Sequence, residues 1–186
     1  MDGDAFDEVM ASLDPPMAVV TAATDGRDGP DNERAGCLVG FHAQSSIDPP
    51  QHAVWLSKAN HTYRVALLAE HLAVHLLADT DADRALAERF GTLSGDDTDK
   101  FAGLDVDTGP GGVPVLAACA HRLVVRRVAV VDVGGDHVCF VTEPVAAASS
   151  GSFRPLRLAA VTDLVPGHEA EERPQPRTER AGPRVG

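Results

Sequence analysis

The strongest constraint on the fold is a pair of adjacent prolines, Pro49 and Pro50, that separates two apolar runs of the chain. The first run covers residues 37–41 and the second covers residues 53–56. Proline cannot donate a backbone hydrogen bond or continue a helix, so the chain must turn here. The pattern predicts two strands joined by this turn, with a polar segment at residues 44–46 between the first strand and the turn.

A helical pattern opens directly after the second strand, around residues 58–62. Unpaired backbone N–H groups and the helix dipole favour an anion at such a helix start. We expect the turn to bring residues 44–46 close to this position, where a phosphate is the natural ligand. Lys58 and Arg64 flank the same turn and suit a dianionic phosphate, although a solvated surface charge is an equally simple interpretation of each.

Three hydroxyl residues near this helix start, Ser45, Ser46 and Thr62, permit two interpretations. Such hydroxyls bind a ligand, or they cap helices and close turns by accepting backbone hydrogen bonds. By residue type, Asn60 is the better helix cap. We therefore expect Thr62 to turn its N–H and hydroxyl groups outward, toward a ligand.

Composition favours a core of small aliphatic residues carried by strands. The length of 186 residues suits one domain. The hydrophobic share of 44% is ordinary, but aromatic residues make up only 4%, which leaves Val, Leu and Ala to build the core. Many strand-like runs with few helices predict a mainly β fold, a β-barrel with a few helices. The further predicted strands cover residues 17–24, 73–77, 121–133, 138–145 and 156–164.

The two ends of the chain differ from its middle. Residues 4–13 place apolar side chains at helical spacing, so we expect an N-terminal helix within residues 1–15. The domain itself is expected over residues 16–165. Residues 166–186 are polar, rich in proline and without periodicity, which is typical of a disordered tail.

The charge of the chain argues against nucleic acid as a partner. A net charge of -12 and a pI near 4.9 oppose the basic surface that non-specific binding needs. No apolar run reaches the length of a membrane span, and no positively charged region precedes an apolar core at the N-terminus. We therefore expect a soluble, cytoplasmic protein without a membrane anchor or a signal peptide.

Disulfide and metal chemistry are not expected either. Cys37, Cys119 and Cys139 are odd in number, far apart and set among apolar residues. This fits reduced, buried thiols better than disulfides or a metal cluster, with a redox-active thiol as the alternative. His71 and His75 are four residues apart, but they straddle an expected change from helix to strand, so we expect no zinc site there.

The stretch around the prolines resembles a pattern of the flavin reductase family. Gly36 precedes the first apolar strand, and a hydroxyl-rich segment leads into Asp48 and the two prolines. The second apolar strand then leads into a polar helix start at residues 60–62, as it does in the family.

Two later segments extend the resemblance. Residues 99–103 are similar to the Asp-Lys-Phe segment of the family, and residues 135–137 are similar to its Gly-Asp-His motif. The resemblance covers roughly residues 16–145, and four motifs in the same order are much more specific than any one of them.

The resemblance implies an FMN-binding split β-barrel that usually acts as a dimer, with its flavin sites at or near the subunit interface. NAD(P)H would be the co-substrate that reduces the flavin at N5, and the reduced flavin would serve a partner monooxygenase. FAD and the deazaflavin F420 are alternatives to FMN in such barrels. The residues that we expect to bind the cofactor are Gly40, Phe41, His42, Ala43, Gln44, Ser45, Ser46, Lys58, Asn60, His61, Thr62, Lys100 and Phe101.

The resemblance points to His137 as the catalytic residue, because the histidine of the family's Gly-Asp-His motif lies close to the flavin and the nicotinamide. Imidazole titrates near neutral pH, so it suits orienting the nicotinamide amide or delivering a proton to reduced flavin. A hairpin histidine bonded to backbone is the simpler alternative. Lys100 and Phe101 lie in a long loop, residues 92–116, and would cover the flavin, reach the neighbouring subunit or only anchor the loop.

Departures from the family pattern motivate a second hypothesis. Leu38 and Gly40 fall where many members carry hydroxyl residues, and Gln44 falls where serine is common. The second hypothesis is a carrier or regulatory protein that binds FMN or F420 but has no diffusible flavin reductase activity. Steady oxidation of NAD(P)H with free FMN in excess would exclude it.

Overall fold

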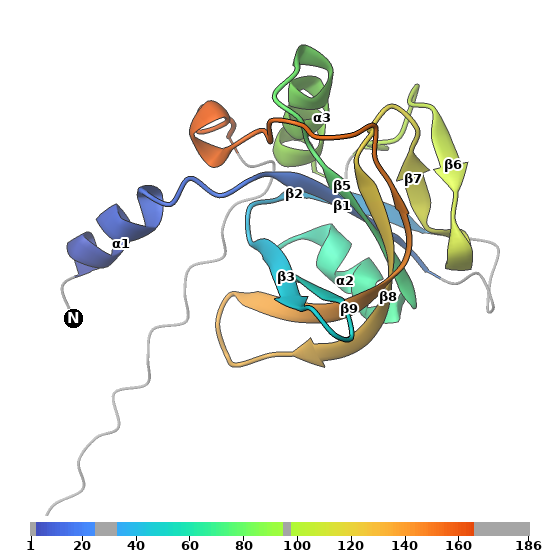
Figure 1. Ribbon diagram of the computed structural model, residues 1–186, viewed down its shortest axis with the longest axis horizontal. Coiled ribbons are helices and arrows are strands. Elements are labelled where there is room, and N and C mark those ends of the chain that lie inside the picture. Colours follow the sequence, from blue (N-terminus) through green and yellow to red (C-terminus); the bar gives the residue numbers. More distant parts are fainter. Residues whose placement is uncertain (1–2, 25–32, 95–97, 166–186) are drawn as a thin grey trace, which may run out of the picture.

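A curled antiparallel sheet forms the body of the protein (Figure 1). The structure is a computed structural model that describes residues 3–24, 33–94 and 98–165. The tail predicted over residues 166–186 therefore lies outside the described residues. Seven strands form the sheet in the order β2-β1-β5-β8-β9-β4-β3. Their bounds are β1 (Ala18–Ala23), β2 (Arg34–Val39), β3 (His42–Ser46), β4 (Gln51–Ser57), β5 (His71–Leu76), β8 (Arg122–Val131) and β9 (His137–Ala148).

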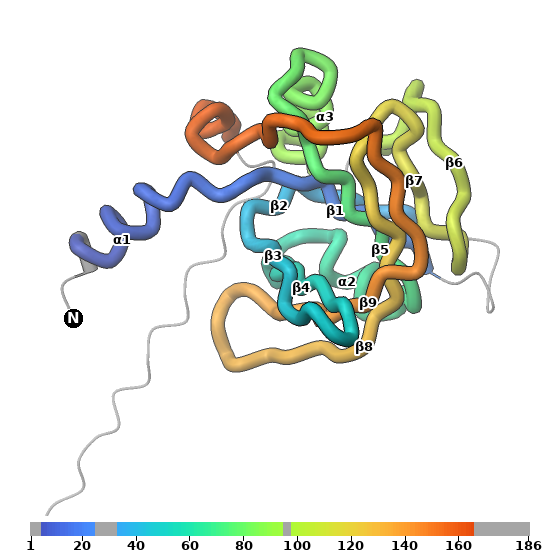
Figure 2. Tube along the Cα trace, in the orientation of Figure 1, coloured from blue at the N-terminus to red at the C-terminus, as the bar shows by residue number. Residues whose placement is uncertain are grey.

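The sheet must curl because its two edge strands are consecutive in the chain. β2 lies at one edge and β3 at the other, yet only residues 40–41 join them. The trace in Figure 2 shows this short link bringing the edges round to the same side of the molecule. The predicted mainly β barrel is thus confirmed.

Three helices and a small second sheet complete the described elements. α1 (Gly3–Ala11) extends away from the barrel, α2 (His61–Leu68) lies within the curl of the sheet, and α3 (Asp81–Thr92) lies outside it (Figure 1). Thr80 caps α3 by accepting a hydrogen bond from the Asp83 N–H. No helix among the described residues is long and apolar enough to cross a membrane. The remaining elements are β6 (Val106–Thr108), β7 (Pro114–Leu116) and the two 3₁₀ turns η1 (Pro110–Gly112) and η2 (Leu158–Ala160).

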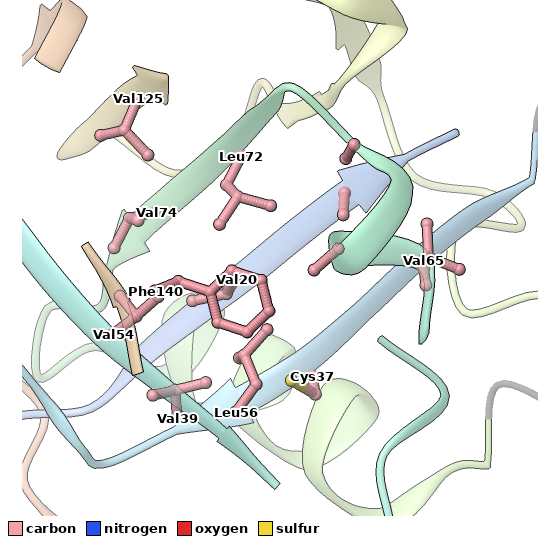
Figure 3. Close-up of a cluster of buried hydrophobic side chains, with 14 of the residues drawn as sticks. Val20, Cys37, Val39, Val54, Leu56, Val65, Leu72, Val74, Val125 and Phe140 are labelled. Carbon is pink, nitrogen blue, oxygen red and sulfur yellow. The ribbon is translucent and has the colours of Figure 1, made fainter. Parts of the chain in front are cut away.

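Two main hydrophobic clusters lie on opposite faces of β1 and β2. The first fills the inside of the curl, where α2 packs against inward-facing strand residues such as Val20, Val54, Leu72 and Phe140 (Figure 3). The second packs α3 against the outer face and is centred on Phe90. Small residues and valines dominate the first cluster, as the scarcity of aromatics predicts.

Several local predictions differ from the structure. The first apolar strand begins earlier and ends at Val39, because the chain leaves β2 at Gly40 to reach the opposite edge. Residues 44–46 are not a separate polar segment but belong to β3, and the turn occupies residues 47–50. The strand predicted over residues 156–164 is wrong, since that segment contains η2.

Candidate functional site

A small cavity lies where the β2–β3 link, the end of β4 and the start of α2 meet. Its volume is about 100 Å³. The pairing register explains the convergence: Ser57 at the end of β4 faces His137 at the start of β9, and the Trp55 N–H donates to the Phe41 carbonyl over 2.9 Å. The lining residues are Leu38, Val39, Gly40, Phe41, Trp55, Ser57, Asn60 and His137.

His137 is held in place on two sides. Its Nδ1 lies 3.0 Å from Asp136 Oδ1, so Nδ1 carries the proton and donates a hydrogen bond to the carboxylate. The Phe41 ring meets the imidazole edge-on, with the ring centroids 5.2 Å apart. Because Nδ1 is the donor, the Nε2 lone pair can accept a proton or a hydrogen bond. The structure thus places this predicted catalytic residue in the same cavity as the predicted Gly40, Phe41 and Asn60.

The start of α2 has the expected cap but an unexpected orientation of Thr62. Asn60 is the N-cap residue, with extended backbone angles. Its side chain makes no capping hydrogen bond, and its carbonyl accepts the Tyr63 N–H over 3.0 Å. The Thr62 side chain is only 2% exposed. It forms a hydrogen bond with the buried Cys37 thiol, whose pKa is raised to about 11, chiefly by burial. The expectation that the Thr62 hydroxyl turns outward is therefore wrong.

The basic residues near α2 have carboxylate or side-chain partners. Lys58 Nζ lies 3.0 Å from Asp132 Oδ1 and 2.9 Å from its Oδ2. His61 Nε2 lies 2.9 Å from Glu33 Oε1, and the Arg64 guanidinium donates to His61 Nδ1 over 2.9 Å. A phosphate at this helix start would therefore meet cations that already have partners.

The predicted residues of β3 do not lie at the start of α2. β3 runs antiparallel to β4 and pairs Gln44 with His52, whereas α2 follows the opposite end of β4 at Ser57. Residues 44–46 are therefore far along the strand from Asn60, and the expectation that they meet there is wrong. Gln44 donates its amide to the Ser46 carbonyl, and Ser45 is exposed.

A second, larger cavity lies beside His42, Ala43 and Gln44. It has a volume of about 450 Å³ and is walled mainly by apolar residues. His42 Nε2 donates to the Pro16 carbonyl over 3.1 Å, and its Nδ1 lies 3.3 Å from His52 Nε2. Burial lowers the pKa of both imidazoles, that of His52 to about 4, so both are neutral at physiological pH.

Lys100 and Phe101 are buried within the chain itself. Lys100 is 7% exposed and donates to the carbonyls of Gly36 and Phe90 over 3.1 and 3.2 Å. Phe101 is 4% exposed and packs edge-on against Phe90, and the Arg34 guanidinium lies over the Phe101 ring, 5.0 Å from its centroid. Their buried side chains fit the alternative of anchoring the loop better than the predicted role in binding the cofactor.

Sequence reasoning missed several residues of this corner. Trp55 and Ser57 alternate with buried residues along β4, so period-2 alternation was an available signal for them. The carboxylates of Glu33 and Asp132 carried no such signal, because their contacts depend on segments distant in sequence. Among the described residues, no group of three or more metal-ligating side chains comes together.

Comparison with known proteins defines the family. Residues 10–159 match the family described as "Flavin reductase like domain". The reductase subunit Stc3 of stachydrine N-demethylase from Rhizobium meliloti is 30% identical over 160 residues, which are 81% of this chain and 63% of the relative. The chain thus spans less than two thirds of that protein. The ferric-chelate reductase (NAD(P)H) of Archaeoglobus fulgidus is 28% identical over 145 residues, 78% of this chain and 79% of the relative.

Solved structures share the fold. A flavin reductase domain protein from Arthrobacter sp. FB24 superposes with a TM-score of 0.70 at 20% identity, covering 85% of this chain and 91% of the other. An FMN-binding protein from Thermus thermophilus gives a TM-score of 0.62 at 22% identity, covering 73% and 71% of the two chains. The match over most of the chain and the shared split barrel show that this protein belongs to the flavin reductase-like domain family.

Proposed function

We propose that this protein is an NAD(P)H-dependent flavin reductase that binds FMN at the corner between the β2–β3 link and α2. One observation carries the proposal. Gly40, Phe41, Asn60 and His137 come from three motifs that are far apart in the sequence, and they line the same cavity. The alternative of unrelated turn and cap residues would not require this convergence.

The residues present fit an FMN molecule. The N–H groups at the start of α2 and the Ser57 hydroxyl, which lines the cavity, are donors suited to a phosphate. Lys58 follows Ser57 in the chain and adds a cation, which in this structure pairs with Asp132. β3 is an edge strand, so one row of its backbone N–H and C=O groups points away from β4. Such a row matches the alternating acceptors and donor along the pyrimidine edge of a flavin. We assign the ring edge to the backbone of residues 40–43.

Bound flavin would supply hydride chemistry at N5. The chain's own task is to hold two rings in contact and to manage protons. Phe41 and Trp55 provide an apolar wall against which an aromatic ring can pack. Asp136 fixes the His137 imidazole so that its Nε2 can accept or deliver a proton, or bind the nicotinamide amide.

The site in one chain is too small for this task, so we include a second copy in the proposal. Ligand pockets commonly measure about 300–1,000 Å³, whereas this cavity measures about 100 Å³. Directly beside it, Trp55, Cys139 and Val131 form one cross-strand row, and Val131 is 45% exposed. We propose that a homodimer covers this apolar row and completes the wall of the site.

The family relationship suggests a physiological role. One relative is named as the reductase subunit of a demethylase. By analogy, we propose that this protein supplies reduced flavin to a partner monooxygenase in the cytoplasm. Its three cysteines are free thiols, which suits a reducing compartment.

Flavin titration followed by turnover tests the proposal. The purified protein is titrated with FMN, FAD and F420 by fluorescence, and NADH or NADPH oxidation is then measured with the flavin that binds. We expect FMN binding and steady oxidation of one nicotinamide. Leu38 and Gly40 line the cavity without a hydroxyl group, and this favours the carrier or regulatory alternative. Bound flavin without turnover would establish that alternative, and a protein that binds no flavin would refute both.

A further inference from the structure

A clamp of two interactions ties the β8–β9 turn to the segment before α2. Asp132 holds the Lys58 ammonium with both carboxylate oxygens, at 3.0 and 2.9 Å, and its Oδ1 also accepts the Gly134 N–H over 2.8 Å. The backbone reinforces this contact, because the Lys58 N–H donates to the Asp136 carbonyl over 2.9 Å. The Lys58 ammonium is thus committed to a carboxylate next to the proposed phosphate position.

The pairing keeps Asp132 charged. Its pKa is lowered by the hydrogen bond from Lys58 and then by the Gly134 N–H, so the carboxylate is ionised at neutral pH. The ion pair is exposed, with 36% of the Lys58 side chain and 46% of the Asp132 side chain accessible. Exposed pairs of this kind contribute little stability, and the long lysine stem can reorient. A stronger anion at the start of α2 can therefore take Lys58 from Asp132.

We propose that Asp132 sets how tightly this protein holds the phosphate of its flavin, because its carboxylate and the phosphate compete for Lys58. The inference rests on the proposed function, since it requires flavin at this corner. Its consequence is that FMN binds weakly enough to exchange, as a substrate of a flavin-supplying reductase must. Asp132 suits this role better than Asp136, which holds the His137 ring, or Glu33, which holds His61.

Comparison of FMN with riboflavin isolates the phosphate, because riboflavin lacks it. The Asp132→Asn variant keeps an oxygen for the Gly134 N–H but loses the charge that holds Lys58. We expect its Kd for FMN to fall by about two- to fivefold, the scale of an exposed charge interaction. Its Kd for riboflavin should stay unchanged. Added salt should reduce the difference in FMN affinity between Asp132→Asn and the wild type.

Two further variants control the experiment. Glu143→Gln removes one carboxylate from the same hairpin, where Glu143 pairs with Arg126, and should leave the Kd for FMN unchanged. In a Lys58→Met background, Asp132→Asn should no longer increase FMN affinity, because the shared cation is absent.

Three outcomes would overturn the inference. An equal decrease in the Kd values of Asp132→Asn for FMN and for riboflavin would mean that the variant opens the site without involving the phosphate. Unchanged or weaker FMN binding in Asp132→Asn would mean that Asp132 does not compete with the phosphate. Each of these results leaves the proposed function intact, whereas binding of neither flavin by the wild type would overturn the proposed function and this inference together.

Discussion

His75 on β5 is a fully buried histidine whose two ring nitrogens both have partners. Nδ1 donates to the Val19 carbonyl over 3.1 Å, and Nε2 accepts the Leu116 N–H over 2.9 Å. Because a backbone N–H can only donate, Nε2 carries no proton and the ring is neutral. This histidine therefore joins β1, β5 and β7, and it has no ligand role in the structure.

Acid should destabilise the protein through His75. Burial lowers its pKa to about 4 in the folded state, from 6.5. As the pH falls, His75 is protonated in the unfolded chain before it is protonated in the folded protein. Its contribution to the free energy of unfolding is therefore fully present above pH 6.5 and is lost progressively toward pH 4. Between pH 7 and pH 5 we expect the free energy of unfolding, measured by urea denaturation, to fall by about 2 kcal/mol more in the wild type than in His75→Gln. Equal losses in the two proteins would contradict this assignment.

His137 should affect turnover and not flavin affinity. In His137→Ala we expect FMN to bind as in the wild type while turnover falls by about a hundredfold or more, because the proton-handling imidazole is gone. Asp136→Asn keeps the imidazole but weakens the hydrogen bond that orients it, so the decrease in turnover should be smaller than in His137→Ala. Full turnover in His137→Ala would remove this residue from the mechanism.

At the scale of elements, the contact between α3 and β2 depends on Gly36. A Cβ atom at this position would lie 2.6 Å from Phe90 Cε1, and the Phe90 ring is only 1% exposed. We expect Gly36→Ala to lower the free energy of unfolding by about 1–3 kcal/mol, measured by urea denaturation.

Gly40→Ala is the matched control for this contact. A Cβ there meets Met17 Sδ at 3.4 Å, which is ordinary contact with a flexible side chain. The control should lose clearly less stability than Gly36→Ala. Comparable losses in the two variants would show that the close approach of Phe90 is not the reason why a larger residue at position 36 destabilises the protein.

The elements around the proline turn show what the sequence can predict. Tandem prolines, apolar runs and the N-cap type of Asn60 are local signals, and they correctly place the turn, β4 and the start of α2. The register of β3 is not a local property. Its polar residues pair with β4 because the chain crosses to the open edge after Gly40, and this carries Gln44 away from α2.

Lys100 illustrates a second limit of sequence reasoning. Lysine in a polar loop is usually exposed. Here it is buried, because two carbonyls from β2 and α3 accept hydrogen bonds from its ammonium group. Those acceptors are 64 and 10 residues away in the chain. Only the packed arrangement of α3 against β2 brings them together, so the pattern around residue 100 permits an anchoring role but does not identify these two acceptors.

At the scale of the whole molecule, flavin binding and self-association should be linked. The apolar row beside the cavity includes Val131, which is 45% exposed in one chain. We expect the wild type to sediment as a dimer, and Val131→Glu to shift it toward monomer and weaken FMN binding in parallel. Leu68→Glu alters a more exposed apolar residue on α2 and should change neither. A wild type that is monomeric while binding FMN tightly would contradict the proposed dimer.

Anaerobic reduction of protein-bound FMN tests the central claim most directly. The complex is mixed with NADH or NADPH in the absence of oxygen, and the visible absorbance of oxidised flavin is followed over time. The proposed function predicts rapid bleaching with at least one nicotinamide, at a rate that saturates with nicotinamide concentration and is slowed in His137→Ala. Bound FMN that stays oxidised, or bleaches no faster than free FMN, would contradict the account.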